Sequence, residues 1–290
     1  MTAQPTTAFR YGMSQFSTMR WSFEQDVENY PRLGVEALDL CEEKLADDHA
    51  DDQLAMVGAA GLPVTSVQPT VRALFATATQ PRPHDHGERL TRYRRSIERL
   101  ARYTPDAAFI VTTGPAPGGD LAGLLDVVTL DLRELADVAA AHGVRIALEP
   151  LHPVLVNVET AIWTFRQAMR LVHEAGRDNL GVCVDLWNLW QDPYLIPGLR
   201  SAGNRIFVLQ VSDWRTPRSF ADRRSIGTGE LPLPELLYAV RAAGFTGPSV
   251  LEILSRDVPD SLWEGDPRAL VRRNRTALEE AWRAATALFA

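Results

Sequence analysis

The sequence alternates short apolar segments with longer amphipathic segments along nearly its whole length. Apolar runs of about four to eight residues are typical of strands buried on both faces, and apolar residues at helical spacing fill the segments between them. The expected strands lie at residues 9–16, 35–40, 64–67, 107–114, 145–149, 180–185, 206–213 and 249–252. The expected helices lie at residues 22–33, 42–60, 88–103, 121–142, 160–175, 193–202, 233–243 and from 266 onward. This alternation predicts parallel strands joined by right-handed crossovers.

The number of strand–helix units then selects the fold. Eight units share 290 residues, which gives about 36 residues per unit, a normal size for a strand and its helix. A closed (β/α)₈ TIM barrel is therefore expected. The alternative is a doubly wound open sheet, which needs a glycine fingerprint after the first strand, and that fingerprint is not found there. We predict a single-domain (β/α)₈ TIM barrel of the α/β class over residues 1–290, with residues 1–8 as a flexible tail.

Composition and charge narrow the class of protein. The chain is 46% hydrophobic, which is enough for a large core, and its formal net charge of −7 argues against a nucleic-acid partner. No apolar run approaches the roughly 18 residues of a membrane span, and the N-terminus lacks a signal-peptide core. Two cysteines do not suggest a disulfide framework. The sequence therefore predicts a soluble cytoplasmic protein without a membrane partner.

Four consecutive expected strands carry an oxygen-bearing side chain at or near their C-terminal ends. These residues are Glu149, Asp185, Gln210 and Glu252. The carboxyl ends of barrel strands share one mouth, so the four side chains should converge there. Three carboxylates and an amide oxygen would repel one another without a cation, and a hard divalent ion accepts such ligands. The pattern predicts a metal site, although any one of these residues alone is better explained as a helix cap or a salt-bridge partner.

Several motifs extend this pattern. They are ALEPLHP at 147–153, VDLWNLW at 184–190, QVSDW at 210–214, GTGE at 227–230 and VLEI at 250–253. Together they resemble the sugar phosphate isomerase/epimerase family, which has the xylose isomerase-like TIM barrel. The family's metal ligands are Glu, Asp, His and Glu on strands five to eight, and this resemblance assigns the same role to Glu149, Asp185 and Glu252. The sequence departs from the family at Gln210 and at Asn188, where histidines are usual. Loss of imidazole favours Mn²⁺ or Mg²⁺ over zinc.

The resemblance also implies a reaction. It implies proton transfer next to a carbonyl through an enediolate, with Glu149 and Glu252 as general base and general acid. The substrate would be a small sugar or polyol. The residues expected to contact it are His152, Trp187, Asn188, Asp213 and Arg223.

The two missing histidines leave other functions open. A metal-dependent lyase could use the same proton abstraction to expel a leaving group, either as a dehydratase or as a subunit that cleaves an oxidised glycoside. The protein could also be a non-catalytic binding barrel. Assembly as a homo-oligomer or with a partner subunit is a further possibility that the sequence leaves open. A DNA-repair endonuclease on the related barrel fits worst, because such sites need more histidines and this chain is acidic.

Overall fold

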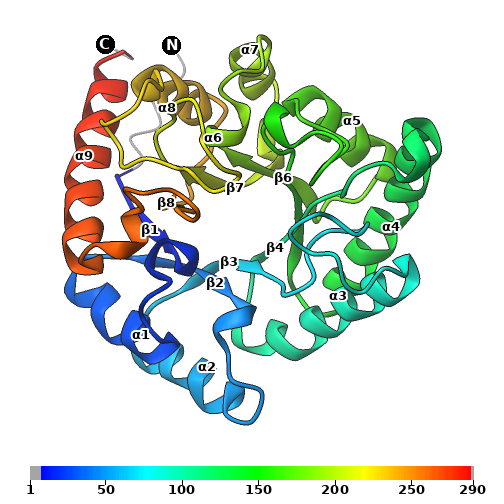
Figure 1. Ribbon diagram of the computed structural model, residues 1–290, viewed down its shortest axis with the longest axis horizontal. Coiled ribbons are helices and arrows are strands. Elements are labelled where there is room, and N and C mark those ends of the chain that lie inside the picture. The colour runs from blue at the N-terminus through cyan, green and yellow to red at the C-terminus, as the bar shows by residue number, and fades with distance from the viewer. Residues whose placement is uncertain (1–7, 289–290) are drawn as a thin grey trace.

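The computed structural model describes residues 8–288, which form a closed barrel of parallel strands surrounded by helices (Figure 1). The strands are β1 (Tyr11–Ser14), β2 (Ala37–Cys41), β3 (Val64–Gln68), β4 (Ala108–Val111), β5 (Arg145–Leu148), β6 (Leu180–Asp185), β7 (Ile206–Val211) and β8 (Ser249–Leu251). Each strand pairs with the next in sequence, and β8 closes the barrel on β1. The predicted TIM barrel is thereby confirmed.

The strands are apolar because both of their faces are buried. One set of side chains points into the barrel, where small and medium residues of neighbouring strands form an inner cluster: Ala108, Ile110, Ala147, Cys183 and Val208. The alternate residues pack outward against the helices in a much larger cluster, to which Phe109, Leu148 and Val184 belong. A strand with water on one face would instead show an alternation of polar and apolar residues.

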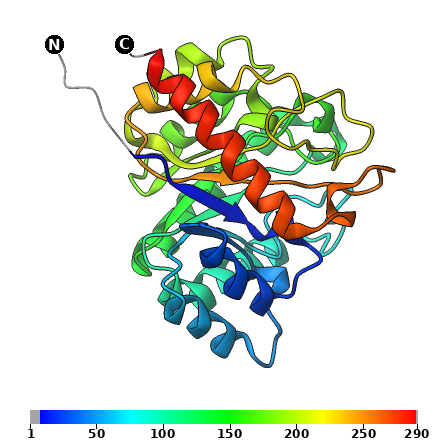
Figure 2. The same cartoon turned by 90° about the vertical axis from the view of Figure 1, so that its left-hand side faces the viewer.

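The helices cover the outside of the barrel. They are α1 (Phe23–Arg32), α2 (Ala50–Ala59), α3 (His86–Leu100), α4 (Leu121–Ala141), α5 (Phe165–Ala175), α6 (Leu186–Leu189), α7 (Leu195–Arg200), α8 (Leu233–Ala242) and α9 (Pro267–Ala287). Ser22 caps α1 through a capping box. Figure 2 shows α9 running along the barrel beside β1, where the Tyr11 hydroxyl donates to Val271 O at 3.2 Å. Among residues 8–288, no helix combines the length and apolarity that crossing a bilayer requires.

Some boundaries differ from the predictions for identifiable reasons. The first strand is shorter than 9–16, because a 3₁₀ turn at Gln15–Thr18 ties two side chains to Asp26. The predicted helix over 42–60 is wrong in its first half. The Glu42 carboxylate turns inward and accepts hydrogen bonds from Thr70 N and Ser96 Oγ, so this residue cannot lie on a solvated helix face. Seven of the eight residues assigned to the flexible tail, 1–7, lie outside the described part of the chain.

Candidate metal and active site

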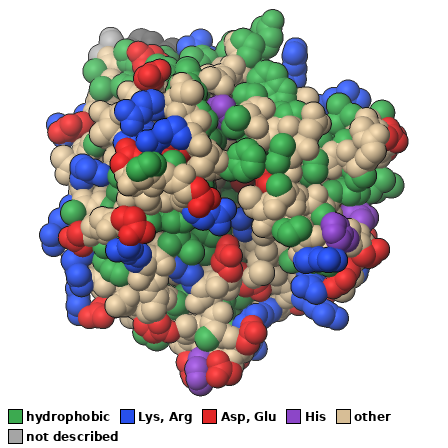
Figure 3. Space-filling view, in the orientation of Figure 1, with side chains coloured by type: hydrophobic (Ala, Val, Ile, Leu, Met, Phe, Trp, Pro, Cys, Tyr) green, Lys and Arg blue, Asp and Glu red, His purple; other side chains and the backbone are tan. Residues whose placement is uncertain are grey.

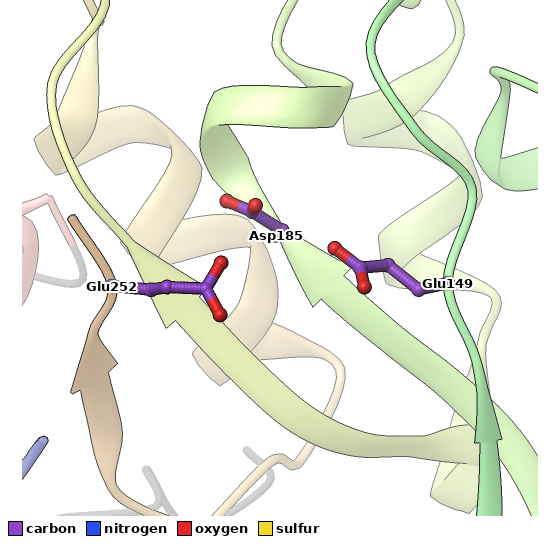
Figure 4. A group of neighbouring side chains, drawn as sticks. All are labelled: Glu149, Asp185 and Glu252. Atoms are coloured by element: carbon purple, nitrogen blue, oxygen red, sulfur yellow. The ribbon is translucent and has the colours of Figure 1, made fainter. Parts of the chain in front are cut away.

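Three carboxylates meet at the mouth of the barrel (Figure 4). Glu149 and Glu252 directly follow β5 and β8. Their backbone N–H groups still donate to the preceding strands, to Val111 O on β4 at 2.9 Å and to Val211 O on β7 at 3.0 Å. Asp185 ends β6 and caps the short helix α6 by accepting from Trp187 N at 2.9 Å. One ligand-capable oxygen from each of the three lies within 4.8 Å of the others. The predicted convergence of strand ends thus brings together three of the four proposed ligands as a compact set of oxygen donors.

This group of carboxylates is buried, which makes its negative charge costly. Burial raises the pKa of Glu149 well above its ordinary range, and the charges of Glu252 and Asp185 raise it further. Burial likewise raises the pKa of Asp185 and takes that of Glu252 to about 8. A divalent cation held between them would offset this cost, and an all-oxygen donor set suits a hard ion. The residues present therefore fit a divalent metal.

Arg223 supplies a positive charge next to the carboxylates. Its Nη2 lies 2.6 Å from Asp185 Oδ2, and its Nη1 lies 3.0 Å from Glu252 Oε2. The guanidinium also lies 5.1 Å from the centre of the Trp187 ring. One buried arginine against three carboxylates leaves net negative charge at the mouth when all are ionised. Arg223 follows β7 in a long loop, so only the folded loop brings it to this position.

Asn188 connects two of the carboxylates. Its side-chain nitrogen donates to Glu149 Oε1 at 2.8 Å and to Asp185 Oδ2 at 2.9 Å. Its side-chain oxygen accepts from His152 N at 3.0 Å. The amide is held from three sides, so it fixes the relative positions of Glu149 and Asp185 rather than offering a mobile contact.

His152 is buried behind the site. Its Nδ1 lies 3.1 Å from Val154 N, and its Nε2 lies 3.1 Å from the indole nitrogen of Trp214. The two donors compete for it, because a neutral imidazole has only one acceptor nitrogen. Burial, together with the charge of Arg223, lowers the pKa of His152 to about 4. This imidazole is therefore neutral near pH 7 and supports the tryptophans around it.

Asp213 belongs to a loop rather than to the cavity. Its Oδ2 accepts from the backbone N–H groups of Gly227 and Gly229, both at 2.9 Å. Its Oδ1 accepts from the N–H groups of Trp214 and Leu231. These four bonds use both carboxylate oxygens, and Asp213 does not line the cavity described below. We therefore assign Asp213 to the anchoring of the GTGE segment rather than to the substrate.

Gln210 lies against the carboxylates, but its amide nitrogen faces them. That nitrogen donates to Glu252 Oε1 at 2.9 Å and to Asp39 Oδ2 at 3.2 Å, while Cys183 Sγ donates to the amide oxygen at 3.2 Å. Gln68 makes a matching pair of bonds to the same two oxygens, at 3.0 and 3.4 Å. In this arrangement Gln210 supports Glu252 as a hydrogen-bond donor, and it would bind a metal only after turning its amide.

Sequence reasoning missed two members of this network. Asp39 lies on β2 and Gln68 ends β3, and both are buried. Asp39 falls within the second expected strand, and Gln68 directly follows the third. Applying the strand-end argument to the first half of the barrel as well as to the second would have found them.

A cavity of about 410 Å³ opens over the carboxylates. Glu149, Glu252, Arg223, Asn188 and Trp187 line it, together with Gln68 and several residues of the first half of the barrel. Figure 3 shows this side of the molecule, where acidic and basic side chains lie interspersed around the centre. The volume suits a small polar molecule of monosaccharide size.

Comparison with curated proteins finds partial relatives. Over 128 residues the chain is 31% identical to an inosose isomerase of Halalkalibacterium halodurans, which covers 42% of this chain and 44% of the relative. Over 181 residues it is 31% identical to a 3-dehydroshikimate dehydratase of Pseudomonas aeruginosa, which covers 58% of this chain and 26% of the relative. The chain thus spans less than half the length of each of these curated relatives.

Comparison with solved structures supports the fold over nearly the whole chain. A protein of Sinorhizobium meliloti 1021 matches with a TM-score of 0.82 at 22% identity, over 93% of this chain and 98% of that one. An IOLI protein with a binding zinc atom matches at 0.77 and 20% identity, over 94% and 98%. An L-ribulose 3-epimerase matches at 0.75 and 17% identity, over 98% and 99%. The model of the xylose isomerase-like TIM barrel family matches residues 27–281, and this chain therefore belongs to that family.

Proposed function

We propose that the protein is a divalent-metal-dependent isomerase or epimerase that acts on a keto-sugar, cyclitol or related polyol. The observation that carries the proposal is the group of three buried carboxylates under a cavity of about 410 Å³. Curated relatives named as inosose isomerases support the reaction class. The proposed reaction moves a proton between carbon atoms next to a carbonyl group.

Glu149, Asp185 and Glu252 would hold the ion, and their oxygen donors favour Mn²⁺ or Mg²⁺. A bound divalent ion supplies Lewis-acid stabilisation of negative charge on a carbonyl oxygen. Arg223 keeps Asp185 and Glu252 in place through its two ion pairs, and Asn188 does the same for Glu149. These contacts hold the carboxylates in place before a ligand binds. Catalytic groups that are already in place can orient a substrate effectively.

Glu149 and Glu252 are the proposed acid and base. They project from β5 and β8 toward a common centre from different sides (Figure 4). Without a cation, burial raises the pKa of Glu252 to about 8, and a bound divalent ion would lower it, so this carboxyl would exchange a proton near neutral pH. In our proposal one of the pair removes the proton from the substrate carbon, and the other returns a proton to the neighbouring position.

A dehydratase is the second candidate. The Pseudomonas aeruginosa relative carries that name, and its match covers more of this chain than the inosose isomerase match does. The amides of Gln210 and Asn188, in place of the family's usual imidazoles, also fit a changed reaction. Proton abstraction by the same carboxylates would then be followed by loss of water instead of return of the proton.

One experiment separates the two reactions. Protein purified without chelator would be assayed for metal by elemental mass spectrometry, then incubated in D₂O with inosose or with 3-dehydroshikimate and followed by NMR. We expect about one equivalent of manganese or magnesium, and deuterium incorporation next to the carbonyl with retention of all substrate oxygens. Loss of water would favour the dehydratase.

The matched variants are Glu252→Gln in the site and Glu134→Gln on the exposed face of α4. The first should lose both metal and exchange, and the second should keep both. No metal uptake by wild type, even after manganese is added, would contradict the proposal.

A further inference from the structure

The cavity contains a second arginine away from the metal-binding carboxylates. Exposure of the lining side chains rises from 4% at Glu252 and 6% at Arg223, through 23% at Arg72, to 57% at Arg256. Arg72 therefore lies between the buried carboxylates at the bottom of the cavity and the solvent. It comes from the segment after β3, in the opposite half of the barrel from Glu149 and Glu252.

Arg72 is held in place but its hydrogen-bonding capacity is not used up. Its backbone oxygen accepts from Thr112 N at 2.9 Å, and its guanidinium lies 5.1 Å from the centre of the Phe16 ring. Its Nη1 is buried and has no hydrogen-bond partner among the described residues. The Arg72 side chain lines the cavity, where an acceptor oxygen of a ligand would add a hydrogen bond to this guanidinium.

The nearby acids do not satisfy this donor. Glu43 Oε1 is 3.6 Å from Arg72 Nη1, beyond hydrogen-bond distance for this geometry, and its side chain is 42% exposed. Glu159 also lines the cavity, but it accepts from Thr79 N and Thr79 Oγ1 at 2.9 and 2.6 Å. Arg72 therefore makes no hydrogen bond to either acid, and among the described residues its charge is offset by the 3.6 Å ion pair with Glu43.

Arg223 differs from Arg72 in its contacts with carboxylates. Its two terminal nitrogens are already paired with Asp185 and Glu252. An anionic group on a ligand would have to compete with two carboxylates for Arg223, whereas it would complete the contacts of Arg72. Arg72 lines the same cavity of about 410 Å³ as Glu149 and Glu252. One small molecule could therefore span the distance from Arg72 to the carboxylates.

We propose that the natural substrate carries a carboxylate, which Arg72 binds while the carbonyl end of the molecule lies over Glu149 and Glu252. This inference rests on the proposed function, and it narrows the substrate class to acidic sugars or cyclic polyol acids. A single negative charge matches one available guanidinium. A phosphate dianion would meet repulsion from Glu43 and Glu159 on the same wall.

The test compares acids with neutral molecules of the same ring. Isothermal calorimetry on manganese-loaded and on metal-free protein would use galacturonate against galactose, and quinate against myo-inositol. Wild type should bind each acid about tenfold or more tightly than its neutral partner, as expected for a charge-assisted pair. In Arg72→Gln, the preference should shrink to about twofold or less. Arg170→Gln, on the exposed surface of α5, removes the same charge elsewhere and should keep the preference.

Three results would overturn the inference: equal affinity for acids and neutral partners, no detectable binding of either acid, or a preference that survives in Arg72→Gln. The last result would place the carboxylate on the metal or on another residue. Turnover of a neutral keto-sugar without acid preference would reject this inference and leave the proposed function intact. A preference for acids in metal-free protein, combined with failure to bind any divalent ion, would support this inference and reject the proposed function. Melting temperatures of the variants would show that they are folded.

Discussion

The two halves of the barrel place different chemistry at equivalent positions. The ends of β5, β6 and β8 lead into Glu149, Asp185 and Glu252, whose oxygens face one another at the mouth. On β2 and β3, Asp39 lies beneath the mouth without lining the cavity, and Gln68 donates hydrogen bonds to it and to Glu252. The second half thus supplies the three carboxylates, and the first half supplies groups that hold one of those carboxylates in place.

Gln210 complicates this division, because it lies in the second half and bonds like Gln68 in the first. Both amide nitrogens donate to Asp39 Oδ2 and to Glu252 Oε1. The role of a strand-end residue is therefore set by its partners across the barrel as well as by its position on a strand. Substitutions at matched positions would test how far the two halves differ.

The largest expected effect is a loss of kcat when carboxylates in each half of the barrel are replaced by amides. Glu149→Gln and Glu252→Gln should lower kcat by about 10²- to 10⁴-fold, because each removes a proposed acid or base. Asp39→Asn should cause a much smaller loss, because Asp39 does not reach the cavity. Steady-state kinetics on a confirmed substrate would measure the difference. Equal losses in all three variants would mean that Asp39 belongs to the reacting group.

An effect of intermediate size is expected on melting temperature and manganese affinity when each of the two glutamines is replaced. Gln68→Leu and Gln210→Leu each remove the bonds to Asp39 and Glu252, and Gln210→Leu also removes the bond from Cys183, so the melting temperature should fall somewhat more in Gln210→Leu. If Gln210 acts only as a donor, manganese affinity measured by calorimetry should weaken equally in both. A loss about tenfold larger in Gln210→Leu would show instead that its oxygen ligates the metal.

The smallest effect should be a pH dependence of stability. Burial raises the pKa of Glu252 from 4.5 to about 8, so between these pH values the folded protein keeps a proton that the unfolded chain has released. This contribution to the free energy of unfolding is fully present below about pH 4.5 and is lost as pH rises through about 8.

For metal-free protein, we expect this contribution to lower the melting temperature by about a few degrees between pH 6 and pH 8. Stabilisation by added manganese should grow over the same interval, because the ion binds the deprotonated carboxylate. Calorimetric melts of wild type and Glu252→Gln would measure both trends. A slope in the variant as steep as that of wild type would assign the effect to other groups, such as Glu149, whose pKa burial raises well above its ordinary range.

Much of the fold could be predicted from the sequence because its signals are local. Apolar runs and helical spacing place the strands and most helices. The errors arose where a long-range contact overrides the local pattern. Glu42, for example, lies in an acidic stretch that suggests a solvated helix, but it is turned inward by Thr70 and Ser96.

The sequence by itself determined the barrel and the meeting of Glu149, Asp185 and Glu252, because parallel strands in sequence order must bring their carboxyl ends to one mouth. Only the tertiary structure decided what the other polar residues do. Asp213 turns to a loop, and Arg72 lines the cavity with Glu43 3.6 Å from its guanidinium. The direction of a loop side chain depends on contacts with residues far away in the sequence, and no local pattern specifies those contacts.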